Sequence, residues 1–152
     1  MKKTLWIMTC CLIAQWASAQ APKWADKAKK AVFSVVTYDK ENKIKGTGNG
    51  FYIDAKGAAL SDYALFEGAE RAVIINADGK QLDVNRILGA NSMYDVVKFN
   101  TAIDKKQTTL TLAAQPAKVG ETVYLLPYST QKATTLQSGK VTAVDSIGSH
   151  FY

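Results

Sequence analysis

The chain has 152 residues, of which 47% are hydrophobic, and a formal net charge of +6 at pH 7. A modest basic excess of this kind favours solubility and a weak attraction for anions. A nucleic-acid partner is not expected, because the sequence lacks a basic stripe interleaved with aromatic residues. The length suits one domain of ordinary size or one half of a larger fold.

The first 19 residues have the pattern of a secretory signal peptide. Lys2 and Lys3 precede an apolar run over residues 5–17, and small residues follow up to Ala19. The run is shorter than the roughly 18 to 20 apolar residues that a membrane-spanning helix needs. We therefore expect cleavage of residues 1–19 after Ala19, no membrane span, and a periplasmic, extracellular or cell-surface protein.

The two cysteines, Cys10 and Cys11, both lie in this first segment. The cleaved chain would contain no thiol, so its stability should come from a packed core rather than from disulfides. A lipid anchor is not expected on either cysteine, because neither follows the leucine-then-small-residue pattern of lipoproteins and both come too early in the chain.

Residues 20–30 are expected to form a short N-terminal helix or linker. Pro22 suits the first position of a helix, and Trp24, Ala28 and Ala31 recur near helical spacing. We expect Trp24 to pack onto the domain that follows.

Short strand-like segments with glycine-bearing turns occupy the rest of the chain. Residues 54–57 and 77–80 are predicted hairpin turns, and Gly79 suits the positive φ that a tight turn requires. Only residues 61–69 are not strand-like. The pattern predicts an all-β barrel or sandwich. The predicted strands are 31–38, 50–54, 58–60, 71–76, 81–88, 96–101, 108–113, 119–126 and 134–144.

Three segments carry a resemblance to a known family. Residues 48–54 read GNGFYID, residues 57–65 read GAALSDYAL, and residues 94–97 read YDVV. In this order they resemble three segments of the HtrA-like, trypsin-like serine peptidases: a glycine-x-glycine strand, the turn that carries the catalytic histidine, and the segment that presents the triad aspartate. The resemblance implies the six-stranded antiparallel β-barrel that forms the amino-terminal half of that fold.

Two further segments resemble the second barrel of the same family. Residues 119–123 read VGETV, like the segment that enters the second barrel, and residues 135–144 resemble its follow-on strand. The resemblance therefore implies that residues 31–152 form the first barrel and an incomplete second barrel of a peptidase domain. We expect the sequence to be a fragment of a longer protein, in which, by resemblance, protein-binding modules would follow.

The departures from the family concern catalysis. Ala64 stands where the family has its general base, and the only histidine is His150. An alanine cannot take a proton from a nucleophile or return it to a leaving amine. A glycine-x-serine-glycine run for the nucleophile is also absent. Since removing the base histidine in another serine peptidase lowers turnover about a million-fold, the resemblance implies a chain that does not hydrolyse peptides, with Asp95 as a vestigial triad acid.

Simpler roles compete with these site assignments. Asp95 is favoured to cap the turn after Asn91 and Ser92, or to accept backbone N–H bonds there. Asp62 and Tyr63 flank Ala64 and suggest a substitute acid or base. We favour instead a short helical turn with Ser61 or Asp62 as its N-cap.

No cofactor and no metal site are expected. Gly46, Gly48 and Gly50 precede a strand without the Lys-Ser/Thr pair of a phosphate loop, so they are interpreted as bends of a barrel strand. His150 has no second histidine or cysteine ligand in the cleaved chain. Aromatic residues in a small barrel usually belong to the core or to an interface rather than to a peptide groove, and this applies to Tyr52, Phe66, Tyr124 and Tyr128.

The leading hypothesis is an exported, catalytically inactive homologue of trypsin-like peptidases that binds polypeptide or a partner protein. One alternative is an active serine endopeptidase, if the full-length protein supplies the base and the nucleophile. A second alternative is an envelope β-barrel adaptor unrelated to peptidases. A fold that separates Ala64 from Asp95 would favour the adaptor.

Overall fold

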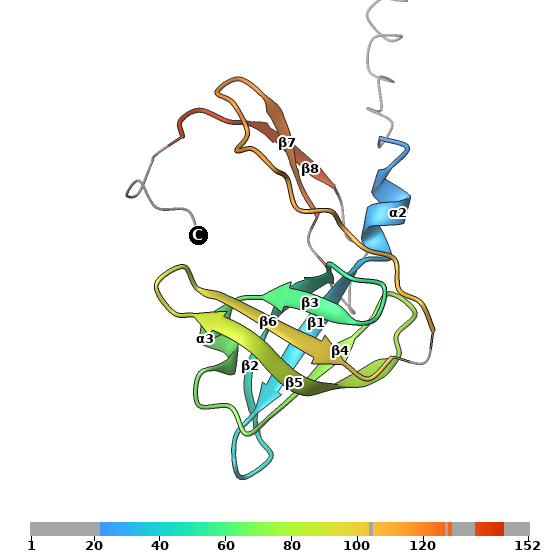
Figure 1. Ribbon diagram of the computed structural model, residues 1–152, viewed down its shortest axis with the longest axis vertical. Coiled ribbons are helices and arrows are strands. Elements are labelled where there is room, and N and C mark those ends of the chain that lie inside the picture. Colours follow the sequence, from blue (N-terminus) through green and yellow to red (C-terminus); the bar gives the residue numbers. More distant parts are fainter. Residues whose placement is uncertain (1–21, 104, 127, 129–135, 145–152) are drawn as a thin grey trace, which may run out of the picture.

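The computed structural model describes residues 22–103, 105–126, 128 and 136–144. Its central unit is a closed antiparallel β-barrel with the strand order β1-β2-β3-β6-β5-β4 (Figure 1). The predicted β-barrel is therefore confirmed. The strands are β1 (Val32–Tyr38), β2 (Ile44–Tyr52), β3 (Ala58–Ser61), β4 (Arg71–Ile75), β5 (Gln81–Asn91) and β6 (Val96–Thr101).

Two of the hairpin turns depend on glycine. Gly57, before β3, and Gly79, before β5, have φ angles of 98° and 76°, in the left-handed region that glycine adopts without steric cost. The second turn is also held by Asn76, whose side-chain oxygen accepts hydrogen bonds from the N–H groups of Asp78 (3.1 Å) and Lys80 (2.9 Å). Both predicted turns are confirmed.

All six strands contribute side chains to one apolar core. The Phe33 ring lies 4.7 Å from the Tyr52 ring and 6.2 Å from the Phe99 ring, edge-on in both cases. Burying one large apolar side chain stabilises a fold by about 1.5–3 kcal/mol, so this cluster is a main source of stability. Its members are Phe33, Val35, Tyr52, Ala59, Ile74, Leu82, Val97 and Phe99.

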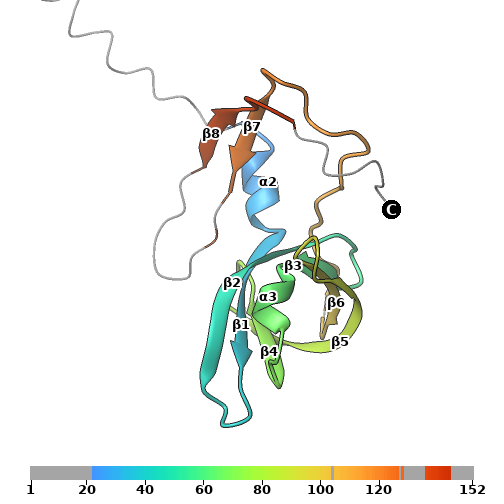
Figure 2. The same ribbon diagram turned by 90° about the vertical axis from the view of Figure 1, so that its left-hand side faces the viewer.

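A short helix, α3 (Tyr63–Phe66), lies across one end of the barrel (Figure 2). Its Leu65 packs against the core and approaches β2 so closely that a Cβ on Gly48 would overlap the Leu65 side chain. A Cβ on Gly50 would lie 2.5 Å from the Phe33 ring and 2.8 Å from the Leu60 carbonyl oxygen. Both glycines therefore permit close packing against β2, which explains the glycine-rich strand.

Two strands are longer than the sequence pattern predicted. β2 begins at Ile44 rather than at residue 50, because its polar first half pairs with β1 although most of its residues are exposed. β5 continues past residue 88 to Asn91, where it pairs with Val96 of β6. Pairing with a neighbouring strand thus extends both elements where the hydrophobic pattern is weak.

An N-terminal helix, α2 (Ala25–Lys29), is shorter than the predicted segment 20–30. It buries Ala25 and Ala28, whereas Trp24 remains 47% exposed. The Trp24 ring contacts the ring of Tyr124 at 5.0 Å, edge-on, so its partner lies outside the barrel. No helix in the described ranges is long and apolar enough to cross a membrane.

A separate two-stranded sheet follows the barrel. It consists of β7 (Thr122–Leu125) and β8 (Gln137–Lys140), and every residue of both strands is exposed. The predicted strand over residues 108–113 is wrong, because this segment pairs with no strand. It runs beside the barrel as an extended connection, in which the Leu110 N–H donates to the Tyr52 carbonyl oxygen at 2.8 Å.

Candidate functional site

Ala64 and Asp95 lie side by side at the end of the barrel that α3 covers. The Ala64 N–H donates a hydrogen bond to the Asp95 carboxylate (Oδ1) at 2.7 Å, across 31 positions of sequence. The Tyr63 N–H also donates to the Asp95 backbone oxygen at 3.2 Å. The two positions that the resemblance pairs in the catalytic triad are therefore in direct contact.

This contact satisfies the first turn of α3. The first N–H groups of a helix lack partners within the helix, and the side chain of the N-cap residue Asp62 makes no capping bond. Asp95, in the turn between β5 and β6, takes this role although it is distant in sequence. Its backbone is left-handed (φ 49°), a conformation that aspartate tolerates better than most residues, and it allows the backbone oxygen and the carboxylate to meet α3 together.

The β5–β6 turn is held by a different residue from the one expected. The side-chain oxygen of Asn91 accepts a hydrogen bond from the Tyr94 N–H at 3.1 Å. The Asp95 carboxylate accepts from α3, not from the turn after Asn91 and Ser92 that the favoured interpretation gave it. The short helical turn predicted around Tyr63 is present, with Asp62 at the N-cap position.

The chemistry available at this site is limited. The methyl group of Ala64 has no proton to exchange, and the Asp95 carboxylate is exposed. The nearby Ser61 hydroxyl donates to the Asn49 carbonyl oxygen at 2.7 Å and is largely buried, so it serves the strand rather than a reaction. His150 lies outside the described residues. Within the described ranges no group of histidine, cysteine or carboxylate side chains is arranged to hold a metal ion.

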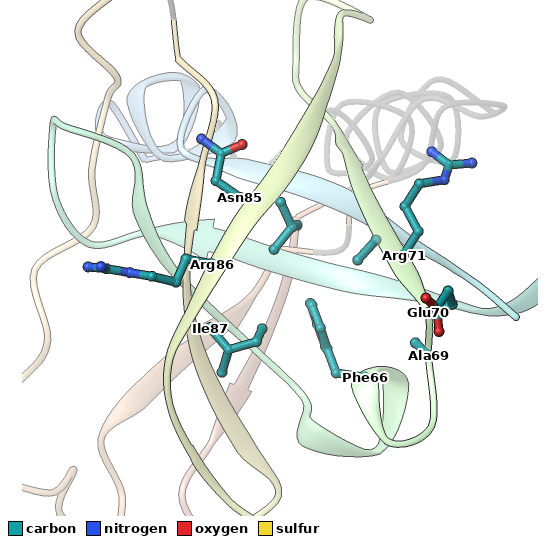
Figure 3. A pocket seen from close by; sticks show the side chains of 9 residues that line it. Phe66, Ala69, Glu70, Arg71, Asn85, Arg86 and Ile87 are labelled. Atoms are coloured by element: carbon teal, nitrogen blue, oxygen red, sulfur yellow. The ribbon is translucent and has the colours of Figure 1, made fainter. Parts of the chain in front are cut away.

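A second feature, absent from the sequence-based predictions, is a cleft between β4 and β5 (Figure 3). β4 pairs with β5 only from Val73 to Ile75, and beyond this the two strands separate. The cleft has a volume of about 240 Å³. Phe66 of α3 lines it and packs against the core ring of Phe99 at 5.1 Å. The lining residues are Phe66, Ala69, Glu70, Arg71, Ala72, Val84, Asn85, Arg86 and Ile87.

The β5 wall of this cleft is an open strand edge. From Val84 onward, no described strand pairs with the β5 edge that faces β4. Ile87 is 47% exposed and Leu88 is 39% exposed, although neighbouring residues of a strand point to opposite faces. Figure 3 shows Ile87 and Phe66 bordering the cleft, whereas Arg86 extends away from it. The uncharged run from Ile87 to Asn91 was the sequence signal for this edge.

The four aromatic residues considered from the sequence have different surroundings. Tyr52 is in the core, as expected, and Phe66 lines the cleft. Tyr124 is exposed apart from its contact with Trp24. The Tyr128 hydroxyl donates to the Asn76 carbonyl oxygen at 2.6 Å. Burial raises the pKa of Tyr128 above its usual value, and the nearby negative charge of Asp78 raises this pKa further.

Two comparisons by sequence, with family models and with curated proteins, give no match. No model of a known protein family matches the chain, and no curated protein matches it by sequence. Its function must therefore be argued from the geometry of the barrel.

Proposed function

We propose that the chain is an exported, non-catalytic homologue of the trypsin-like serine peptidases, and that its barrel binds polypeptide. The observation that carries this proposal is the 2.7 Å hydrogen bond between the Ala64 N–H and the Asp95 carboxylate. It supports the proposal because two positions matched to the family by short motifs meet in space on a closed antiparallel barrel. A fold that separates these positions would have favoured the adaptor alternative.

Loss of catalysis follows from the residue at position 64. A peptidase of this type needs an imidazole between its carboxylate and its nucleophile, to accept and return one proton in each half-reaction. By the resemblance, Asp95 occupies the position of the triad carboxylate, but the side chain at the position of the base is the methyl group of Ala64. Asp95 instead accepts hydrogen bonds from the first turn of α3.

The cleft between β4 and β5 is the best-supported place for a polypeptide. It combines an apolar lining from Phe66, Val84 and Ile87 with the open edge of β5. An extended peptide can add to such an edge through main-chain hydrogen bonds while one of its side chains fills the pocket. This recognition mode needs no particular sequence beyond a large apolar side chain in an extended segment.

Binding of a fluorescein-labelled, permanently unfolded polypeptide, followed by anisotropy, tests the proposal. We expect the wild type to bind and Ile87→Asp to bind at least about tenfold more weakly, because a charge would replace an anchor of the cleft. Ile44→Asp is the matched control, since Ile44 is also an exposed β-strand isoleucine but lies outside the cleft. Absence of wild-type binding, or equal losses in both variants, would contradict polypeptide binding at the cleft.

Hydrolysis is tested on the same protein with a quenched casein substrate and a fluorophosphonate probe of serine hydrolases. We expect neither turnover above the buffer blank nor labelling, in the wild type and in Ala64→His alike, because the glycine-x-serine-glycine run is missing. Labelling of the full-length protein would revive the active-endopeptidase alternative. Binding of a folded envelope protein but of no unfolded chain would favour the adaptor.

Export rests on the predicted signal peptide, residues 1–19. Mass spectrometry of the protein from fractionated cells should place it in the envelope or the medium, with Gln20 as its first residue. A cytoplasmic protein that retains Met1 would refute export without affecting the binding proposal.

A further inference from the structure

Lysines gather at the end of the barrel that carries α2. We call this region the basic end. Among its described residues it also contains three aspartates, Asp26, Asp54 and Asp78, so lysines outnumber carboxylates there. The seven lysines of the basic end are Lys23, Lys27, Lys29, Lys30, Lys56, Lys105 and Lys106.

Two cavities lie within the basic end. The first, of about 260 Å³, opens between three segments distant in sequence: Lys30 after α2, the β4–β5 turn at residues 76–78, and the connection at residues 105–108. The second, of about 530 Å³, lies between residues 54–56 and the chain after β6. Lys105 and Lys106 line both cavities, so the two are neighbours along this face.

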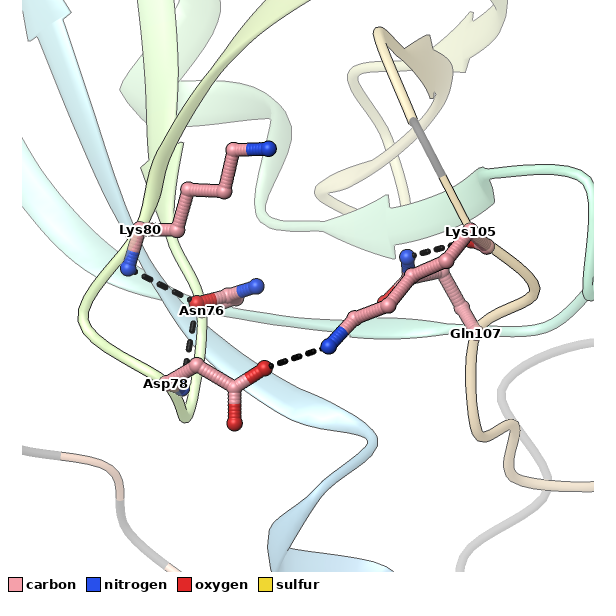
Figure 4. A network of polar contacts seen from close by, with 5 residues as sticks. All are labelled: Asn76, Asp78, Lys80, Lys105 and Gln107. Atoms are coloured by element: carbon pink, nitrogen blue, oxygen red, sulfur yellow. Dashed lines mark hydrogen bonds and ion pairs between the residues drawn. The ribbon is translucent and has the colours of Figure 1, made fainter.

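Hydrogen bonds fix the walls of the first cavity (Figure 4). The side chain of Asn76 holds the turn that presents Asp78. The Lys105 ammonium group donates to the Asp78 carboxylate at 2.9 Å, and the Gln107 side-chain amide donates to the Lys105 carbonyl oxygen at 2.7 Å. Hydrogen bonds thus connect the polar groups that line the cavity.

The charges around this cavity do not cancel. Lys105 forms an ion pair with Asp78, the one acidic side chain among the described residues that line the cavity. Lys30 and Lys106 line the same cavity, and neither forms an ion pair with a carboxylate of the described residues. Two lysines without an ion-pair partner among the described residues thus line a polar cavity, together with the hydroxyl-bearing residue Thr108.

We propose that this cavity binds a phosphate group, with Lys30 and Lys106 as the charged donors and Thr108 as a neutral one. Ammonium groups form short, charge-assisted hydrogen bonds with phosphate oxygens. Since one water takes about 30 Å³ in the liquid, a cavity of about 260 Å³ has room for a phosphate group and several waters. The phosphate belongs either to a small soluble ester or to a lipid headgroup, and the same donors serve both.

The site is tested by titrating ¹⁵N-labelled protein with inorganic phosphate and with phosphoglycerol, against sodium chloride at equal ionic strength. We expect phosphate, but not chloride, to shift the amide signals of Asp78, Gln107 and Thr108 in a saturable way. The double variant Lys30→Gln/Lys106→Gln should bind about tenfold or more weakly, because each lost ammonium group removes a charged hydrogen bond. Lys106→Arg should retain binding.

The matched control is Lys40→Gln/Lys43→Gln, which removes the same charge from the β1–β2 hairpin at the opposite end of the barrel (Figure 1). It should bind phosphate like the wild type. If both double variants bound phosphate equally weakly, net charge alone would explain the loss and the proposed site would be wrong. Wild-type amide signals that do not shift at millimolar phosphate would also contradict the site.

Vesicles identify the source of the phosphate. Sedimentation with phosphatidylglycerol vesicles, but not with phosphatidylcholine vesicles, that is lost in Lys30→Gln/Lys106→Gln and competed by phosphoglycerol would assign a lipid headgroup. Saturable shifts with phosphoglycerol and no sedimentation would assign a soluble ester. The site does not depend on polypeptide binding at the cleft, so the two proposals stand or fall separately.

Discussion

Asp95 caps a helix from which it is separated by 31 positions of sequence. A helix N-cap normally satisfies its own first turn, but here the N-cap residue Asp62 makes no side-chain bond to α3. Asp95 supplies both acceptors instead, one from its backbone and one from its carboxylate. One residue of the β5–β6 hairpin thereby fixes the position of the helix that packs Leu65 and Phe66 onto the core.

Replacing Asp95 should therefore destabilise the barrel. We expect Asp95→Ala to lower the free energy of unfolding by about 1–2 kcal/mol, because a helix N–H loses its acceptor. Asp95→Asn is the matched control: asparagine keeps a side-chain oxygen and tolerates left-handed φ, so it should lose less. Urea unfolding followed by circular dichroism measures both. An Asp95→Ala protein as stable as the wild type would show that the bond contributes nothing to stability.

Tyr128 should make stability depend on pH in the alkaline range. Its folded-state pKa lies above the value of about 10 expected in the unfolded chain. Its contribution is therefore complete below about pH 10 and is lost as the pH rises through the folded-state pKa. Tyr128→Phe should be less stable than the wild type by about 1 kcal/mol near neutral pH, and the difference should shrink in strong alkali. If the stability difference between the wild type and Tyr128→Phe stayed the same at every pH, ionisation of Tyr128 would not affect stability.

At the site, the sequence predicted which positions meet but not how they meet. The short motifs predicted that Ala64 and Asp95 lie close together. The bond itself could not be predicted, because its donor is a backbone N–H and every residue type except proline carries one. The favoured turn-capping role failed for a related reason, since Asn91 is equally able to cap that turn and its side-chain oxygen accepts from the Tyr94 N–H.

The glycine-rich strand β2 shows how one element accommodates two neighbours. Gly48 leaves room for Leu65 of α3, and Gly50 leaves room for Phe33 of the core. A side chain at either position would push a packed residue out of place. The backbone of β2 is thus the surface against which both pack.

Gly50→Ala should destabilise the protein by about 1–3 kcal/mol, the usual cost of overpacking a core. The added Cβ meets the Leu60 carbonyl oxygen at 2.8 Å, and backbone cannot move aside as a side chain can. Gly89→Ala is the control, because no heavy atom lies within 4 Å of the position of its Cβ. It should be neutral or slightly stabilising. Thermal unfolding of both variants checks this, and similar losses would contradict the packing argument.

Strands were predicted correctly where hydrophobic residues alternate. They were misplaced where only pairing with a neighbouring strand determines whether a strand forms. β1, β3, β4 and β6 lie within one or two residues of their predicted bounds. The apolar residues at 108–113 gave the same pattern, but they find no strand to pair with. Strand formation there would need a neighbour, which a local pattern does not reveal.

The described residues form a packed barrel and a hairpin, β7–β8, that has few contacts with the rest of the protein. The β7–β8 sheet has no buried residue, and Tyr124 reaches the rest of the protein through Trp24. Two-stranded sheets are marginal in water without such support. The cooperative unit of the fold should therefore be the barrel, with the hairpin opening separately.

Amide hydrogen exchange should separate these two parts. We expect the amides of Val35 and Phe99 to exchange only on global unfolding, and those of Val123 and Tyr124 to exchange through local opening, faster by orders of magnitude. Trp24→Ala should speed exchange in β7 and leave the barrel amides unchanged. Uniform protection across β1 and β7 would show instead that hairpin and barrel unfold as one body.

The strand order of the barrel also limits the order in which its strands can pair during folding. The first four strands can form a sheet in the order β3-β2-β1-β4, but its two outer strands, β3 and β4, would both remain unpaired. The β5–β6 hairpin fills the gap, with β6 against β3 and β5 against β4. During synthesis from the N-terminus, the edges of β3 and β4 therefore stay unpaired until residues up to Thr101 have been made. We expect a chain of this length to bind chaperones and to be prone to aggregation.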